Sequence, residues 1–183
     1  QLEAIGELDD TVFFYIVVLI PQASIRFCVW LLSLTIYRVK VYGRENLPRE
    51  GGALLVPNHV TWIDGILLML TSSRPVRMIA WAPNIEATPR LKRLSELFGA
   101  IPIDPTKPKK IVAAFKAARE ALNAVDLVCI FPEGKLTATG EMNAFRGGVA
   151  KIVERSKVPV IPMALRGLWG SVFTRDPSNI FER

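Results

Sequence analysis

Short apolar stretches alternate with amphipathic ones from residue 38 to residue 164, and this alternation constrains the fold more than any other feature. The apolar stretches have the length of buried strands, and the amphipathic ones have the periodicity of helices. Strands that alternate with helices form a largely parallel sheet covered by helices. The sequence therefore predicts an α/β fold with a mixed, largely parallel sheet flanked by helices. The expected strands are 38–42, 53–56, 76–80, 101–103, 127–131 and 160–164, and the expected helices are 63–70, 90–98, 111–122 and 148–155.

The length and composition exclude several classes of protein. At 183 residues the chain fits one domain of ordinary size, and 50% hydrophobic with 22% charged residues excludes a disordered chain and a wholly membrane-embedded bundle. The two cysteines lack the spacing of a metal site, and the single histidine excludes any site that needs two imidazoles. We therefore expect neither a bound metal nor a disulfide scaffold.

A long apolar segment precedes the alternating region. Residues 11–37 are long enough to span a membrane, yet Pro21 and Arg26 interrupt the middle, and a proline inside a helix costs about 3 kcal/mol or more. Two short apolar helices, 11–20 and 25–36, that form a hairpin in one leaflet are therefore the favoured interpretation. The alternative is an ordinary helical pair that caps the core.

The single histidine follows an expected strand, and open α/β sheets form their sites at such strand ends. His59 is followed five residues later by Asp64, in the first turn of the next expected helix, so the two side chains can meet. An imidazole accepts a proton near neutral pH, and a carboxylate on its other nitrogen stabilises the imidazolium. The pair predicts a general base with its orienting group. The alternative is that Asp64 only caps the helix and His59 faces solvent.

A second polar group follows the strand expected at 127–131. Glu133, Gly134 and Lys135 come directly after it, and Arg146 precedes two glycines and the next expected helix. Glycine lets backbone amides approach an anion, and the two cations add positive charge. The group is typical of a phosphate site, although the same glycine also occurs in plain turns.

Other kinds of chemistry find no support in the sequence. A G-x-S-x-G motif is absent and both cysteines lie in apolar runs, which disfavours a covalent nucleophile. A Walker loop and the dinucleotide glycine pattern are also absent. The histidine would therefore activate an incoming hydroxyl directly.

Four motifs, taken in order, connect these residues to a known family. They are NHVTWID at 58–64, GAIPIDP at 99–105, FPEG at 131–134 and VPVIPMAL at 158–165. With this set the chain resembles the glycerolipid acyltransferases of the lysophosphatidic-acid acyltransferase superfamily. Within it, FPEGKLTATGEM is most similar to the acyltransferase part of bacterial 2-acylglycerophosphoethanolamine acyltransferases, which can be fused to a transporter and an acyl carrier protein ligase.

The resemblance implies direct acyl transfer. His59, held by Asp64, takes the proton from the free hydroxyl of a lysophospholipid, and that oxygen attacks an acyl thioester. Acyl carrier protein or coenzyme A would bring the acyl group as a cosubstrate, and no cofactor would be bound. The residues implied in substrate binding are Asn58, Asp104, Glu133, Gly134, Lys135 and Arg146.

The resemblance also implies a setting for the chain. Residues 38–183 would be the catalytic domain, and residues 1–37 would be a membrane-association segment before it. The enzyme would act at the cytoplasmic face of the bacterial inner membrane, on membrane lipid and lysophospholipid. The chain would be a fragment of a longer protein, fused to transporter and ligase domains.

Two departures from the family pattern bear on the acceptor. Pro105 and Leu136 stand where the family often has arginines that bind phosphate. A lysophospholipid carries one phosphodiester charge, whereas lysophosphatidic acid carries up to two, so fewer cations suffice for the former. We therefore expect lysophosphatidylethanolamine as the acceptor, in phospholipid repair or remodelling. The alternatives are a 1-acylglycerol-3-phosphate acyltransferase of phosphatidic acid synthesis and a non-catalytic lipid-binding module.

The formal net charge of +6 favours an anionic partner. Nucleic acid is disfavoured because aromatic and basic residues are not interleaved as a stacking platform requires. Anionic lipid and an acidic acyl carrier protein remain, and the alternative is a merely solvated face. The basic residues concerned are Arg74, Arg77, Arg90, Lys92, Arg93, Lys107, Lys109 and Lys110.

Overall fold

The computed structural model describes residues 24, 27, 31, 39–171 and 174. The chain divides into two compact units, Gln1–Lys40 and Val41–Arg183. The hairpin predicted over 11–36 falls outside the described residues at all but three positions, so it stays a prediction. Within the described part of the chain, no helix combines the length and the apolar character needed to cross a membrane.

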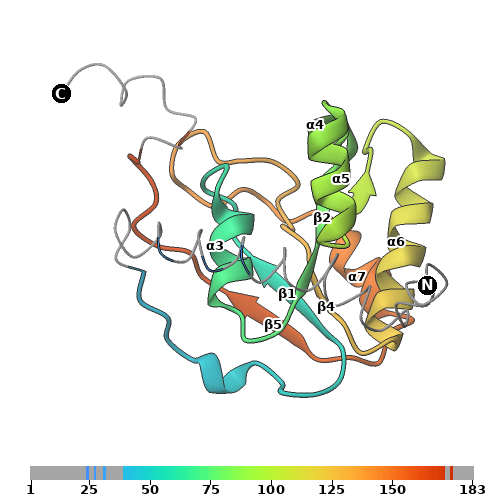
Figure 1. Ribbon diagram of the computed structural model, residues 1–183, viewed down its shortest axis with the longest axis horizontal. Coiled ribbons are helices and arrows are strands. Elements are labelled where there is room, and N and C mark those ends of the chain that lie inside the picture. Colours follow the sequence, from blue (N-terminus) through green and yellow to red (C-terminus); the bar gives the residue numbers. More distant parts are fainter. Residues whose placement is uncertain (1–23, 25–26, 28–30, 32–38, 172–173, 175–183) are drawn as a thin grey trace, which may run out of the picture. The chain divides into compact units, whose positions relative to one another are not determined.

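A five-stranded sheet forms the centre of the second unit (Figure 1). Its order is β3-β2-β4-β1-β5, and every pairing is parallel, so the predicted α/β class is confirmed and no antiparallel strand joins the described sheet. In register, Leu54 lies beside Val128 of β4 and Val160 of β5. The strands are β1 (Ala53–Pro57), β2 (Val76–Trp81), β3 (Ile101–Ile103), β4 (Leu127–Cys129) and β5 (Val160–Met163).

Helices cover both faces of this sheet and create two apolar layers. Alternate side chains of a strand point to opposite faces, so Leu54 packs with α6 and α7 residues while Ala53 and Leu55 pack with Leu68 of α3. Burial of each large apolar side chain contributes about 1.5–3 kcal/mol, so both layers hold the sheet in place. The helical elements are η3 (Arg44–Asn46), α3 (Asp64–Thr71), α4 (Ala82–Ile85), α5 (Pro89–Leu97), α6 (Pro108–Asn123) and α7 (Gly148–Val153).

The predicted elements occur near their expected positions, with three exceptions. The strand predicted over 38–42 is wrong, because residues 39–43 have no regular structure. Val41 is 38% exposed and Tyr42 is 85% exposed, so the alternating pattern there has neither a core to face nor a neighbouring strand to pair with. The other two exceptions are the short helices η3 and α4, which carry no apolar periodicity in the sequence and were not predicted.

The parallel sheet brings the loops that follow its strands to a single edge. The strand order places β1 between β4 and β5, so the loops after these three strands are neighbours. Those loops begin near residues 58, 130 and 164, where three of the four motifs lie. The loop after β3, with the remaining motif, is separated from β1 by two strands.

Candidate active site

A histidine and an aspartate form the centre of the site. Asp64 opens α3 and is fully buried, and its Oδ2 accepts a hydrogen bond from His59 Nδ1 at 2.9 Å, as predicted. The same oxygen accepts from the backbone N–H groups of Val60 at 2.6 Å and Thr61 at 2.9 Å, and Oδ1 accepts from the Thr61 hydroxyl. Four donors therefore fix the carboxylate, and the carboxylate fixes the ring.

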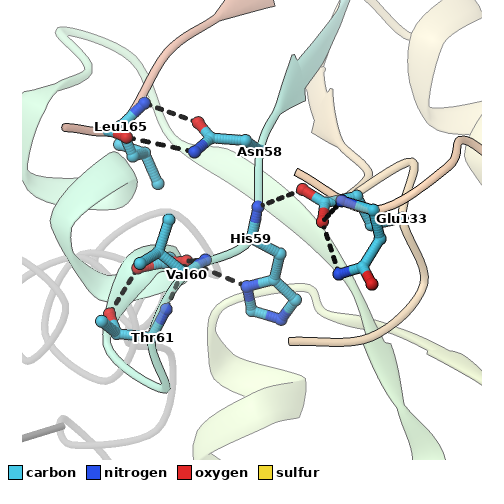
Figure 2. Close-up of polar contacts among 8 residues, drawn as sticks. Asn58, His59, Val60, Thr61, Glu133 and Leu165 are labelled. Carbon is cyan, nitrogen blue, oxygen red and sulfur yellow. Dashed lines mark hydrogen bonds and ion pairs between the residues drawn. The ribbon is translucent and has the colours of Figure 1, made fainter. Parts of the chain in front are cut away.

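The geometry of His59 leaves one ring nitrogen open. A carboxylate can only accept, so Nδ1 carries the proton and Nε2 carries the lone pair. The ring stacks on Phe131 with centroids 3.9 Å apart and planes 17° apart, while the side chain stays 21% exposed. Figure 2 marks a contact at the ring of His59, which is the bond between Nδ1 and Asp64, and no described residue hydrogen-bonds to the second nitrogen. Nε2 can therefore take a proton from a bound hydroxyl group.

Glu133 joins the loop after β4 to the loop after β1. Its side chain is buried, and Oε1 accepts from the backbone N–H of His59 at 2.7 Å. Its Oε2 accepts from the backbone N–H of Asn143 at 2.7 Å and from the side-chain amide at 2.8 Å (Figure 2). Both oxygens thus accept hydrogen bonds from the protein, and these bonds fix the backbone of His59 relative to the loop after β4. Direct contact of Glu133 with the acceptor stays a prediction.

Asn58 makes the corresponding connection to the loop after β5. Its side-chain amide donates to the Leu165 carbonyl at 3.1 Å, and its Oδ1 accepts from the Leu165 N–H at 2.6 Å (Figure 2). The backbone N–H of Thr137 also donates to the His59 carbonyl at 3.0 Å. Three loops, from strands far apart in sequence, therefore hold the residues around His59.

A cation lies directly over the glycine that follows Glu133. Gly134 has φ +64°, which favours glycine, and a Cβ built on it would lie 2.9 Å from Arg146 Cδ and 3.0 Å from Nε, so a larger residue would displace the arginine side chain. The backbone N–H of Arg146 donates to the Pro132 carbonyl at 2.8 Å, which fixes the approach. Arg146 and Lys135 are both exposed, and no described carboxylate pairs with either. They can therefore receive an anion.

Asp104 lies apart from this group. It directly follows β3, and its Oδ1 accepts from the backbone N–H of Thr106 at 3.1 Å and from the Thr106 hydroxyl at 2.6 Å. Lys107 Nζ lies 3.3 Å from its other oxygen. The Thr106 hydroxyl, above all, lowers the pKa of Asp104 below its ordinary value. With β2 and β4 between β3 and β1, Asp104 stands roughly 14 Å from the His59 strand, at the turn into α6.

Two further positions matter for the chemistry. Leu136 is buried, so the position where the family often has a cation faces the interior. Cys129 is fully buried, and this burial raises the pKa of its thiol, which keeps it protonated and unreactive. Cys28 lies outside the described residues. Among the described residues, no cluster of three or more histidine, cysteine or acidic side chains could hold a metal ion.

Sequence reasoning missed four contributors to the site. Phe131 is the first residue of the FPEG motif, so its place in the motif was a usable signal of a role in the site. Thr61 likewise stands inside NHVTWID, three residues before the carboxylate that it contacts. Asn143 and the backbone of Leu165 carry no local signal, because their contacts span 10 and 107 residues.

Comparison with known proteins gives a consistent result. Residues 38–166 match the family model described as Acyltransferase. The chain is 27% identical over 132 residues to a chloroplastic 1-acyl-sn-glycerol-3-phosphate acyltransferase of Arabidopsis thaliana, covering 72% of this chain and 36% of that protein. It is 23% identical over 157 residues to a probable 1-acyl-sn-glycerol-3-phosphate acyltransferase of Mycoplasma pneumoniae, covering 82% and 59%.

A third relative extends the comparison to another bacterium. The 1-acyl-sn-glycerol-3-phosphate acyltransferase of Bacillus subtilis is 28% identical over 138 residues, covering 70% of this chain and 63% of that protein. The chain thus spans between about a third and two thirds of the length of these curated relatives. No solved structure matches it. The matched residues include the four motifs and all the side chains that hold His59, and the chain belongs to the acyltransferase family, in the superfamily of the 1-acyl-sn-glycerol-3-phosphate acyltransferases.

Proposed function

We propose that this chain transfers a fatty acyl group from an acyl thioester to the free hydroxyl of 1-acylglycerol 3-phosphate. The observation that carries the proposal is the His59 imidazole, held by Asp64 and Phe131 with Nε2 open at the carboxyl edge of the sheet. The names of the relatives support this acceptor, because all three are 1-acyl-sn-glycerol-3-phosphate acyltransferases. This acceptor is the alternative stated from the sequence, and it replaces lysophosphatidylethanolamine as the first choice.

The reaction proceeds by general-base catalysis at Nε2. The imidazole takes the proton as the hydroxyl oxygen of the acceptor attacks the thioester carbonyl, and a tetrahedral oxyanion forms. Its collapse forms the new ester, breaks the carbon–sulfur bond and expels a thiolate, which receives the proton from the imidazolium. Asp64 accepts from Nδ1 throughout, so it stabilises the positive charge that the ring carries between these two steps.

The cations beside this base suit a phosphate-bearing acceptor. Gly134 immediately follows Glu133, whose carboxylate bonds to the His59 backbone, so the Arg146 side chain lies over the loop that is bonded to the loop of the base. Arg146 presents its guanidinium at an exposed position, and a guanidinium binds phosphate through two parallel hydrogen bonds. Lys135, one residue along, adds a second charge. Together they would hold the phosphate while the hydroxyl reaches Nε2.

A second candidate acceptor is lysophosphatidylethanolamine, as in the 2-acylglycerophosphoethanolamine acyltransferases. One observation favours it: Leu136 is buried and Pro105 replaces a cation, so the site holds fewer positive charges than a phosphomonoester with up to two charges would use. A phosphodiester carries one charge and needs fewer partners. With this acceptor we also expect fusion to transporter and ligase domains, and acyl carrier protein as the donor.

The test is acyl transfer from both thioester donors, acyl-coenzyme A and acyl carrier protein, to both acceptors in detergent micelles. We expect the protein to acylate 1-acylglycerol 3-phosphate in preference to lysophosphatidylethanolamine, and His59→Ala to form product about 10²–10⁴-fold more slowly. The reverse preference would establish the second candidate. If the folded protein binds lysolipid but acylates neither acceptor, the non-catalytic lipid-binding module is correct. We propose the cytoplasmic face of the bacterial inner membrane as the place of action.

A further inference from the structure

The helix α5 stands outside the packing that holds the other long helices. α6 buries five residues, Ala114, Phe115, Ala118, Ala121 and Leu122, whereas α5 buries none. Every residue from 86 to 94 is exposed. In Figure 1, α4 and α5 rise from the end of β2, at the edge where the strands terminate. The exposed helix α5 therefore lies at the same edge of the sheet as the loop that carries His59.

Interactions at its own N-terminus, rather than contacts with the core, favour the helical conformation of α5. The Thr88 side chain accepts from the backbone N–H of Leu91 at 3.2 Å, and Pro89 occupies the first turn, where its missing N–H costs nothing. A nine-residue helix that buries no residue fully is marginal in water. α5 therefore gains stability if a partner covers its apolar side.

The exposed surface of α5 has an apolar strip bordered by cations. Leu91 is 45% exposed and Leu94 is 40% exposed, and residues three apart share a helix face. Each residue turns the helix by about 100°, and this rotation places Arg90 and Arg93 on one side of the strip and Lys92 on the other. We call these five residues the α5 surface.

The cations of the α5 surface differ from Arg74 and Arg77, whose side chains are bonded within the protein. Arg74 donates to the carbonyls of Pro48 at 3.0 Å and Gly51 at 2.8 Å, and Arg77 donates to the Gly99 carbonyl at 2.8 Å and pairs with Asp126. These two arginines hold loops together. In the α5 surface, Lys92 only approaches Glu96 at 4.0 Å with both side chains more than half exposed, and no described carboxylate pairs with Arg90 or Arg93. Their charge is available to a partner.

We propose that the α5 surface docks on a lipid bilayer that contains anionic lipid. An apolar strip between cations is the pattern of helices that lie in the membrane interface, where leucines enter the acyl boundary and cations contact headgroups. Trp81, 50% exposed at the end of β2, adds an aromatic side chain of the kind enriched at such interfaces. The inference does not rest on acyl transfer, and it supplies a contact separate from residues 1–37.

The test is co-sedimentation of the full chain with phosphatidylcholine vesicles that contain or lack phosphatidylglycerol. The test variant reverses Arg90, Lys92 and Arg93 to Glu. The matched control reverses Lys151, Arg155 and Lys157 to Glu, three exposed cations on α7 and the turn after it, so both variants have the same net charge. A further variant, Leu91→Ser with Leu94→Ser, removes the apolar strip and keeps the charge.

We expect the α5 reversal to lower binding to phosphatidylglycerol vesicles by at least about 10²-fold, since each of the three lost cations adds roughly fivefold and the new carboxylates are repelled by the anionic surface. The control should bind as wild type, and the double serine variant should lose about tenfold on both kinds of vesicle. Equal losses in the α5 reversal and the control would overturn the proposal in favour of net charge alone. Unchanged binding in the α5 variants would also overturn it, and so would a dimer that light scattering finds only in wild type, which would assign the surface to a second copy.

Discussion

Glu133→Gln separates a carboxylate that holds the site together from one that contacts the acceptor. Glu133 is buried, and its two oxygens accept from three donors, the His59 N–H and the backbone and side-chain amides of Asn143. Glutamine retains the shape but offers one acceptor oxygen in place of two. If that oxygen stays with His59, the new NH₂ group faces Asn143, whose side-chain amide can turn to accept from it, but whose backbone N–H cannot.

The cost follows from these contacts. One partly buried N–H left without an acceptor costs about 1–3 kcal/mol, and the remaining bonds lose the extra strength that a charged acceptor gives them. We expect Glu133→Gln to lower the free energy of unfolding by about 2–4 kcal/mol. Because His59 is held through its backbone, kcat should also fall, while the KM for the acceptor stays close to wild type.

The assay is urea unfolding followed by tryptophan fluorescence, together with the initial rate at a range of acceptor concentrations. Glu141→Gln is the matched control, an exposed carboxylate in the same loop, and it should change the free energy of unfolding by less than about 0.5 kcal/mol. The reasoning is refuted if Glu133→Gln unfolds like wild type and raises the acceptor KM at least about tenfold, because the carboxylate would then bind substrate directly.

Three further predictions concern the base, the cation and the acid range. His59→Ala should lower kcat by about 10²–10⁴-fold while changing the free energy of unfolding by no more than about 1.5 kcal/mol, measured by rates and urea unfolding; a variant with wild-type kcat would remove His59 as the base. Arg146→Ala should raise the KM for the acceptor about tenfold or more and leave the KM for the thioester donor unchanged, with partial recovery in Arg146→Lys; equal effects on both KM values would contradict phosphate binding. Because the pKa of Asp104 is lowered in the fold, its stabilising effect is present above about pH 4 and is lost as the pH falls through the folded pKa. Asp104→Asn should therefore flatten the loss of stability between neutral and acid pH in urea unfolding, and an unchanged slope would contradict the role of the Thr106 hydroxyl.

The elements of the fold could be predicted because their signals are local. Apolar runs at 53–56 and 76–80 and the apolar spacing along 111–122 read directly as strands and a helix, and the structure places β1, β2 and α6 there. The strand predicted at 38–42 is wrong because a local pattern is not enough to form a strand. Alternation shows which residues could line a strand, but it does not show whether another strand lies beside them.

The site divides in the same way. The contact between His59 and Asp64 spans five residues across one turn, so the sequence was enough to expect it. The role of Glu133 was not readable, because its partners lie 74 and 10 residues away and neither carries a motif signal that names the other. The sequence indicated Glu133 as a substrate contact, which stays a prediction, and the structure adds that its buried carboxylate links two loops.

By itself the sequence determined the chemistry available to this protein: one imidazole, an acid five residues away, and two cations beside a glycine. Only the tertiary structure decided which of these residues work together. The order β3-β2-β4-β1-β5 brings the loops of β4 and β5 to His59 and leaves Asp104 two strands further away, although all four motifs looked equivalent in the chain. The physical reason is that periodicity encodes which face of an element is buried, whereas strand order depends on packing between segments that are distant in sequence, and no local pattern contains that free energy.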